Sequence, residues 1–447
     1  AYGAQDVMLT GNPKMTFFKS VFRSYTNFSI ESKKLNIEGN ITALENSFDC
    51  VISRNGDLLS GLWMEINIPS VLNNNNAATF THWCNNTGAA FVKQCEIDIG
   101  GQMIEKHDSL WYDIYNELNN TDIHANKQIN KNKSLIYRQN GNKQNAPNLH
   151  LMIPLHFWFT KNKGSSLPLI ALQYHEVTLK IVTRAIRNLL ITDADNSNIV
   201  FRPANIEIWA DFVFLDTPER KRFAQSKHTY LVEQVQLHTE NIVNRNQNIE
   251  IMFSHPVKQL VWVFTNTNRT QEINTSNLAA NPSLFRSKRL QDNGTTILAN
   301  GYTESSRPGN DYFNYMPTST AGNTSVITAP ASGSSINGDN TMENFETVVL
   351  KLNGHHRFEA RRAVYFRTIQ PVQSYPQVPS KHIYVYSFSI NPKEYQPSGS
   401  CNFSRLDSAE LEFNNLGEIT NKQLSVYAIN YNILHIASGM GGLAFAH

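Results

Sequence analysis

The chain has 447 residues, more than one hydrophobic core of ordinary size usually supports, so we expect two domains. The 39 Lys and Arg residues nearly balance the 37 Asp and Glu residues, which argues against a role in coating nucleic acid or an anionic membrane. Hydrophobic residues make up 40% of the chain, enough to build cores, whereas charged residues make up only 17%.

Asn supplies much of the missing polarity, at about one residue in eight. A surface made polar by amides instead of charges suits a protein that packs against many copies of itself. It equally suits a loop-rich β protein, because Asn is a common turn residue, so composition leaves both interpretations open. The sequence contains no apolar run long enough for a membrane helix and no signal-peptide pattern at its start, so we expect neither a membrane span nor secretion.

The first predicted element lies in GNPKMTFFKSVFRSYTNF, residues 11–28. A helix starting at Met15 would gather six hydrophobic side chains on one side, away from Lys19 and Arg23. These six are Phe17, Phe18, Val21, Phe22, Tyr25 and Phe28. Such a face, lying ahead of the first domain, needs a partner to cover it.

Alternation of apolar and polar residues, with many β-branched side chains, predicts strands along most of the chain. The clearest strand patterns lie at 48–69, 94–107, 205–215, 259–266, 383–390 and 423–434. Two short helices are also predicted, at 109–120 and at 217–225, where Thr217 is the expected cap and Pro218 fills the first turn. The predicted fold class is therefore all-β, with short helices in the connections.

A tight turn is predicted where Arg54, Asn55, Gly56 and Asp57 follow one another. Asn-Gly is a strong turn signal, and Arg54 and Asp57 are spaced to form an ion pair across the turn. We interpret the segment as a structural turn in preference to a binding site.

Polar loops rich in Asn, Gly, Ser and Thr separate the strands at 73–88, 124–148 and about 266–344. The last tract lacks the composition for a core of its own, so we expect a long exposed insertion. The basic segment 124–144 is a candidate for binding nucleic acid, but Tyr137 is its only aromatic platform. We therefore interpret it as an exposed loop.

Glycan acceptor sequences of the Asn-x-Ser/Thr type are weak candidates for modification. They occur at Asn268, Asn274, Asn293, Asn323 and Asn402. In a chain so rich in Asn, many such matches arise by chance. Without a signal peptide, glycosylation by a host secretory pathway is not expected.

The two halves of the chain resemble one another at three places that occur in the same order. The pairs are 96–112 with 349–366, 167–181 with 400–413, and 206–215 with 424–433. The shared order predicts a duplicated β domain, and two jelly-roll sandwiches accommodate the long loops best. The seam is expected within 215–230, where Arg220, Lys221 and Arg222 form either a solvated face or a contact with a neighbouring subunit.

Motifs that would indicate an enzyme are weak. His175 and Glu176 lack the second His that a helical zinc site needs four residues after His175, and their segment alternates like a strand. His355 and His356 are adjacent, so on a strand they point to opposite faces. The glycine-rich segment 439–444 has no following helix to receive a phosphate, so we interpret it as a close-packed terminus. We therefore expect no catalytic residue, no metal and no other cofactor.

Six segments are similar to the major capsid proteins of nucleocytoplasmic large DNA viruses, most closely to those of algal viruses. They are AYGAQDVMLTGNPKMTFFKSVFRSYTNFSIES (1–32), ISRNGDLLS (52–60), LPLIALQYHEVTL (167–179), FLDTPERKRFAQ (214–225), QPSGSCNFSRLD (396–407) and NYNILHIASGMGGLAFA (430–446). They span nearly the whole chain, whereas the long middle tract and the loop near 124–148 carry no match.

The resemblance implies a double jelly roll, with eight-stranded sandwiches at 31–214 and 228–447 joined by a connection at 215–227. It implies a homotrimeric capsomer of pseudo-hexagonal outline that tiles an icosahedral virion shell, made and assembled in the host cytoplasm, without catalytic turnover or direct contact with nucleic acid. Residues 1–30 would form an assembly arm at the inner face, where subunits meet each other and minor capsid proteins. Outer loops would be able to carry glycans.

From the residues alone, a jelly-roll protein that binds glycans is the alternative. Lectins share this fold, and the loops of this chain are rich in Asn, Asp and aromatic residues. A glycan array distinguishes a lectin from a capsid protein, because a lectin binds sugars selectively as an isolated protein.

Overall fold

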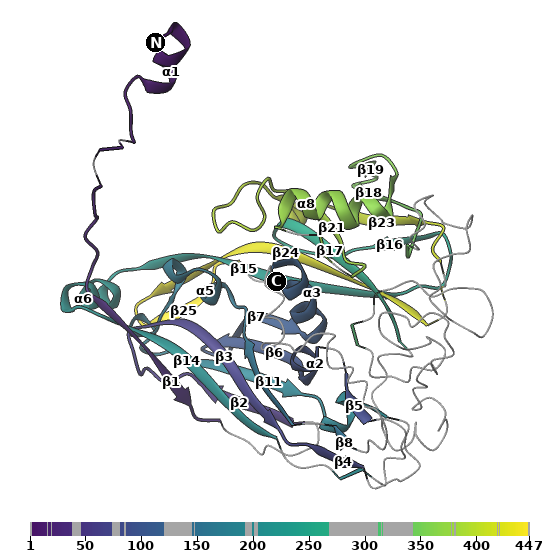
Figure 1. The fold of residues 1–447 in the computed structure, drawn as a ribbon, viewed down its shortest axis with the longest axis horizontal. Coiled ribbons are helices and arrows are strands. Elements are labelled where there is room, and N and C mark those ends of the chain that lie inside the picture. Colours follow the sequence, from purple (N-terminus) through teal and green to yellow (C-terminus); the bar gives the residue numbers. More distant parts are fainter. Residues whose placement is uncertain are drawn as a thin grey trace.

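The computed structural model shows an all-β molecule with an extended N-terminal segment (Figure 1). It describes residues 2–15, 17–18, 20–37, 46–73, 81–84, 86–119, 145–146, 148–192, 199–200, 204–267, 312–313, 315, 343–376, 378–379, 381–417, 419 and 421–445. Every strand pairing in these parts of the chain is antiparallel.

The strands from β1 to β14 form a jelly roll, which we call the first jelly roll. One sheet has the order β1 (Phe28–Leu35), β14 (Asn205–Leu215), β3 (Leu58–Ile68) and β10 (Leu167–Pro168), and β9 (Leu149–Pro154) also pairs with β3. The other has the order β2 (Asn46–Val51), β11 (Val177–Thr183), β6 (Val92–Ile99) and β7 (Gln102–Asp108). With β9 and β10 counted as one strand, the orders along the chain are 1-8-3-6 and 2-7-4-5, which is the jelly-roll arrangement.

The second jelly roll repeats this arrangement. One sheet has the order β15 (His228–Asn241), β24 (Lys422–Ala437), β17 (Pro256–Asn266) and β21 (Tyr384–Ser387), with β22 (Cys401–Asn402) and β25 (Met440–Leu443) at its sides. The other has the order β16 (Gln247–Glu250), β23 (Ala409–Asn414), β18 (Thr347–Leu352) and β19 (His355–His356), and β20 (Arg361–Arg362) pairs with β18. Its strands again follow 1-8-3-6 and 2-7-4-5, so the predicted double jelly roll is confirmed.

The internal similarities in the sequence fall on equivalent strands of the two jelly rolls. The first pair covers β6 and β7 in one half and β18 and β19 in the other; the second covers β10 and β11, and β22 and β23; the third covers β14 and β24. Each similarity therefore marks the same position in a duplicated sandwich.

Smaller elements complete the molecule. Two small sheets have the orders β12 (Leu190–Thr192) with β5 (Thr81–Trp83), and β13 (Ile199–Val200), β4 (Val71–Asn73) and β8 (Asn145–Ala146). The helices are α1 (Ala4–Thr10), α2 (Thr87–Phe91), α3 (Ser109–Asn119), α5 (Trp158–Lys161), α6 (Thr217–Gln225) and α8 (Gln370–Ser374). Short turns of 3₁₀ or π type are η1 (Lys163–Ser165), η2 (Leu169–Ala171), η3 (Ile186–Leu189), η7 (Tyr365–Ile369) and η8 (Phe403–Arg405).

Strand β24 is buried on both faces, which explains how the two jelly rolls are joined. Alternate residues Leu424, Val426 and Ala428 belong to the core of the second sandwich. Their neighbours Tyr427 and Ile429 belong instead to a hydrophobic core that is continuous with the first jelly roll. The sheet β15-β24-β17-β21 thus packs against the first jelly roll with its outer face, next to α3 and β7 (Figure 1).

The prediction of a helix from Met15 is wrong. The helix in this region is α1, which ends at Thr10, and residues 17–18 and 20–27 are not helical. Phe28 already belongs to strand β1. Aromatic, Val, Ser and Thr residues have low helix propensity, and a short helix in water depends on packing of its apolar face.

The tract at 266–344 is not exposed throughout. Within its described residues, Tyr312, Phe313 and Tyr315 are buried in the hydrophobic core of the first jelly roll. The Tyr312 hydroxyl donates a hydrogen bond to the Asn188 carbonyl at 2.8 Å. Three aromatic residues therefore anchor the tract to the body, although its average composition is polar.

Candidate assembly surfaces and the interface between the jelly rolls

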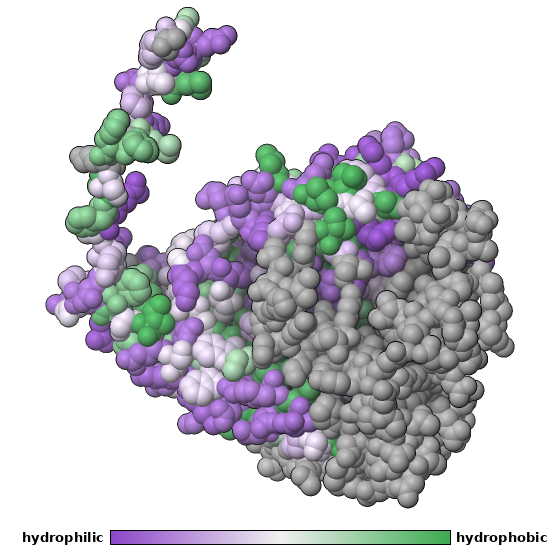
Figure 2. All heavy atoms as spheres, viewed as in Figure 1, coloured by the Kyte–Doolittle hydropathy of each residue, from purple (hydrophilic) through white to green (hydrophobic). Residues whose placement is uncertain are grey.

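The N-terminal segment is the most apolar exposed part of the described chain. We call residues 2–27 the N-terminal arm, and Figure 1 shows it leading away from the body beside α6. Phe17, Phe18 and Phe22 each expose more than nine-tenths of their surface, at 95%, 93% and 91%. Hydrophobic residues also line the arm in Figure 2. A surface of this kind marks a site of contact with another molecule.

The arm continues directly into a strand at the edge of a sheet. Strand β1 pairs with β14 and lies at the end of the strand order, so no described strand pairs with the backbone groups of its other edge. Phe28 is 48% exposed and Ile30 is 45% exposed. Because Phe28 lies opposite Leu215, the arm leaves the body just before helix α6 begins at Thr217. The predicted arm therefore lies next to the predicted connection between the two domains.

Helix α6 begins and ends where the sequence predicts, but its cap is different. The Asp216 side chain, and not that of Thr217, caps the helix by accepting a hydrogen bond from the Thr217 amide at 2.8 Å. Arg220, Lys221 and Arg222 are all exposed, and no residue of the helix is buried.

The turn at 54–57 is present, but the predicted ion pair between Arg54 and Asp57 is wrong. The Arg54 Nη2 atom donates to the Gln173 carbonyl at 2.7 Å, and Asp57 Oδ1 lies 3.0 Å from Arg220 Nε. The other carboxylate oxygen of Asp57 accepts a hydrogen bond from the Leu215 amide at 2.8 Å. Both charged side chains of the turn thus use partners that are distant in the sequence.

Gly56 and Asn55 also have structural positions in this turn. A Cβ atom on Gly56 would lie 2.6 Å from the Cβ of Phe212, so close approach of two backbones requires glycine here. The Asn55 amide donates to the Ser53 carbonyl at 2.8 Å. Asp57 is 4% exposed, and its ion pair with Arg220 joins the turn to helix α6.

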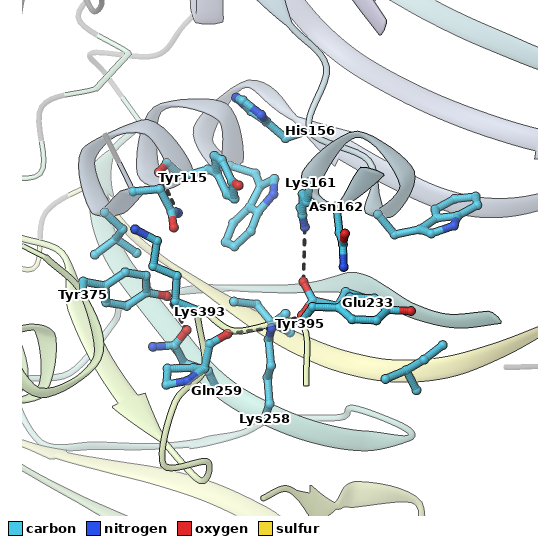
Figure 3. Close-up of a pocket in the computed structure, with 17 residues that line it drawn as sticks. Tyr115, His156, Lys161, Asn162, Glu233, Lys258, Gln259, Tyr375, Lys393 and Tyr395 are labelled. Atoms are coloured by element: carbon cyan, nitrogen blue, oxygen red, sulfur yellow. Dashed lines mark hydrogen bonds and ion pairs between the residues drawn. The ribbon is translucent and has the colours of Figure 1, made fainter. Parts of the chain in front are cut away.

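A buried charge cluster lies between the jelly rolls (Figure 3). Glu233 on β15 accepts hydrogen bonds from Lys161 of α5, at 3.4 Å, and from Lys258 of β17. Burial by itself would raise the pKa of Glu233, but the two ammonium groups lower it overall. Burial lowers the pKa of Lys258 although Glu233 acts in the opposite direction.

Two further aspartates of the first jelly roll bind residues of the second. Lys381 Nζ contacts both carboxylate oxygens of Asp113 at 2.6 Å, and the Tyr427 hydroxyl donates to Asp108 Oδ2 at 2.8 Å. Burial raises the pKa of Asp108, although hydrogen bonds from the Trp111 amide and the Tyr427 hydroxyl stabilise its charge. Sequence reasoning missed these residues because their partners lie far away along the chain.

The glycine-rich C-terminal segment packs tightly, as predicted. The Tyr174 amide donates to the Gly439 carbonyl at 2.9 Å, and His175 Nδ1 lies 2.9 Å from the Gly441 carbonyl oxygen. His175 therefore holds the C-terminal hairpin against the first jelly roll, which is a structural role. His355 and His356 are exposed in strand β19.

The glycan candidates divide into two groups. Asn268, Asn274, Asn293 and Asn323 lie outside the described residues. Asn402 is exposed in β22, and its Oδ1 atom accepts a hydrogen bond from the Ser404 amide at 3.1 Å, which caps η8. Asn402 thus has a local structural role, and its modification stays a prediction.

The described ranges contain no group of three or more His, Cys, Asp or Glu residues placed to hold a metal ion. In the same ranges, the helices are too short or too polar to cross a membrane. The candidate surfaces for contact with other molecules are the N-terminal arm, the edge strand β1 and helix α6.

Comparison with known proteins covers the chain from the arm to the C-terminal hairpin. Residues 16–216 match the family model described as "Major capsid protein N-terminus". Residues 219–442 match the model described as "Large eukaryotic DNA virus major capsid protein". The two matches meet at helix α6.

Individual relatives agree with these models. The chain is 34% identical to the major capsid protein of Paramecium bursaria Chlorella virus 1, with 100% of this chain and 98% of the relative covered. It is 33% identical to the major capsid protein of Phaeocystis pouchetii virus, with the same coverage. A chain in the quasi-atomic model of the PBCV-1 virus capsid superposes with a TM-score of 0.71 and 29% identity, covering 97% of this chain and 100% of that chain.

These matches confirm the resemblance seen in the sequence, and they agree with the repeated jelly-roll order of the strands. The chain belongs to the family of large eukaryotic DNA virus major capsid proteins, and it is a component of the virion shell.

Proposed function

We propose that three copies of this chain form a capsomer of pseudo-hexagonal outline, and that these capsomers tile an icosahedral shell without catalysing a reaction. The observation that carries this proposal is the identical strand order of the two jelly rolls, 1-8-3-6 and 2-7-4-5. Two similar domains in each of three chains give six similar faces, and such a body fits a hexagonal lattice.

The proposed domain division is an N-terminal segment at 1–30, which includes the N-terminal arm and the start of β1, jelly rolls at 31–214 and 228–447, and a connection at 215–227. The connection contains α6, whose exposed Lys221 and Arg222 are available to a neighbouring subunit. The interface between the jelly rolls, with its shared core, keeps the two domains of each subunit in a fixed relation.

Light scattering on the purified full-length protein tests the trimer. We expect a mass of three times the 50.7 kDa chain at dilute concentrations. A persistent monomer would contradict the proposal, and selective binding on a glycan array would favour a lectin-like role instead.

We also propose that the N-terminal arm locks the capsomer into the shell by packing against subunits and minor capsid proteins at the inner face. The support is the exposure of Phe17, Phe18 and Phe22 next to the edge strand β1. When a partner covers these exposed aromatic side chains, a large apolar area is removed from water, and this burial favours binding.

A triple variant, Phe17→Ser, Phe18→Ser and Phe22→Ser, tests the arm without shortening the chain. We expect trimers that form at normal yield but assemble into shells poorly, as seen by electron microscopy and by shell disassembly in urea. A Lys14→Ser and Arg23→Ser variant, which changes polar residues of the same arm, is the matched control. Shells of normal stability from the Phe variant would refute the role of the arm.

A further inference from the structure

A cavity lies at the interface between the jelly rolls, next to the charge cluster around Glu233 (Figure 3). Its volume is about 440 Å³, which is in the range of sites for small molecules. Helices α3 and α5 of the first jelly roll border it on one side, and strands β15 and β17 of the second border it on the other.

Three buried hydrogen-bond donors in the cavity wall have no acceptor among the described residues. They are Trp111 Nε1, Trp158 Nε1 and Gln259 Nε2; the His156 Nε2 atom of the same wall, a donor or an acceptor depending on its tautomer, also lacks a partner there. The two Trp side chains are each 2% exposed, and Gln259 is fully buried. The Gln259 Oε1 atom already accepts a hydrogen bond from the Tyr375 hydroxyl, so the amide is held with its nitrogen unpaired. Buried donors of this kind normally have partners, so the cavity is suited to a ligand that accepts hydrogen bonds.

The charges around the cavity favour a negative ligand. Lys161, Lys258 and Lys393 contribute to the wall, and Glu233 is the only carboxylate among the lining residues. One oxygen of Glu233 accepts from Lys161 and the other from Lys258, so the carboxylate is already occupied. Lys393 is exposed at the cavity and supplies a further positive charge. The wall thus carries an excess of positive charge together with unpaired donors.

The remaining wall is largely aromatic. Trp111, Tyr115, Trp158, Tyr375 and Tyr395 contribute rings, and Leu118, Leu231 and Ile429 add aliphatic surface. Rings of this kind stack on flat apolar groups and bind them with little loss of side-chain entropy.

We propose that this cavity binds a small organic anion, in which a carboxylate or a similar anionic group is attached to a flat apolar body. The anionic group is attracted by Lys393 and accepts a hydrogen bond from one of the donors in the wall that lack an acceptor among the described residues. The flat body lies between the aromatic side chains. A ligand in this position contacts both jelly rolls of one subunit.

Isothermal titration calorimetry of the full-length protein with 2-naphthoate tests the proposal. We expect one site per chain, and at least tenfold weaker binding of both 2-naphthamide, which lacks the charge, and acetate, which lacks the flat body. Absence of naphthoate binding, or equal binding of the neutral amide, would overturn the proposal.

Variants then locate the site. Gln259→Leu and Trp158→Phe each remove one donor while keeping most of the side-chain volume, and Lys393→Met removes a charge at an exposed position. We expect Lys393→Met, and at least one of the two donor variants, to weaken naphthoate binding at least fivefold. Trp262→Phe is the matched control, because Trp262 Nε1 is also buried without an acceptor among the described residues, but its side chain lies in the core of the second sandwich.

Circular dichroism and light scattering establish that each variant keeps its fold and its oligomeric state. If Gln259→Leu and Trp158→Phe both unfold, the effect of Lys393→Met on naphthoate binding alone decides whether the ligand lies in this cavity. Naphthoate binding that Lys393→Met leaves unchanged in the folded protein would place the ligand elsewhere and overturn the proposal.

Discussion

At the scale of single residues, Asp57 connects the turn, strand β14 and helix α6. Its carboxylate accepts a hydrogen bond from the Leu215 amide and lies 3.0 Å from Arg220 Nε. The two contacts differ in environment, because the Asp57 side chain is 6% exposed and that of Arg220 is 56% exposed. The hydrogen bond to the backbone should therefore contribute more to stability than the ion pair, which solvent screens.

We predict that Asp57→Ala lowers the free energy of unfolding by about 1–3 kcal/mol, because it leaves a backbone donor without its acceptor. Arg220→Ala should lower it by less than about 1 kcal/mol, since the arginine is exposed. Urea unfolding of both variants and the wild type measures the difference. Equal losses in the two variants would contradict this ranking.

At the scale of elements, the hairpin of β24 and β25 joins the C-terminus to the first jelly roll. Ser438 and Gly439 both have positive φ, at 54° and 80°, which is the backbone of a two-residue type I′ turn. A Cβ atom on Gly439 would lie 2.5 Å from the Tyr174 ring. Both the turn and the close approach to Tyr174 therefore require glycine at this position.

We predict that Gly439→Ala destabilises the protein by about 1–3 kcal/mol, since the alanine is strained at positive φ and the Tyr174 ring must move. Limited proteolysis should then cut the C-terminal segment faster, and the thermal unfolding midpoint should fall. Met440→Ala, at a position 51% exposed in the same hairpin, is the control. If the control loses as much stability, the turn geometry is not the cause.

Elements with local signals could be predicted from the sequence. Helix α6 was predicted from Pro218 in its first turn, and it has the predicted bounds. The duplicated sandwich followed from alternating strands whose order repeats. The helix from Met15 failed because a periodic pattern of apolar residues does not form a helix without a surface to pack on.

The contacts between elements could not be predicted in the same way. Glu233, Asp113 and Asp108 find their partners across the domain interface, and no spacing along the chain connects them. The ion pair expected between Arg54 and Asp57 was wrong because that expectation rested only on their nearness in the sequence.

At the scale of the whole molecule, the charge cluster at Glu233 makes the domain interface sensitive to pH. The folded protein holds the pKa of Glu233 below its ordinary value of 4.5. Such a group stabilises the folded state above pH values of about 4.5, and this contribution disappears as the pH falls through the lowered pKa.

We predict that Glu233→Gln lowers the free energy of unfolding at pH 7 by about 3 kcal/mol, because the ammonium groups of Lys161 and Lys258 lose their counter-charge in a buried position. The difference from the wild type should shrink as the pH falls below 4.5, because the carboxylate is then protonated in the unfolded chain and, at the lowered pKa, in the folded protein as well. Urea unfolding at several pH values measures this. A difference that is constant with pH would contradict the role of the charge.

The burial of β24 on both faces also determines how a shell can bend. Any rotation of one jelly roll against the other would separate Tyr427 and Ile429 from the shared core and break the contacts of Asp108 and Asp113. These contacts therefore oppose rotation of the two jelly rolls against each other within one chain. If copies of this chain form the closed shell proposed above, its curvature has to be taken up at the contacts between molecules.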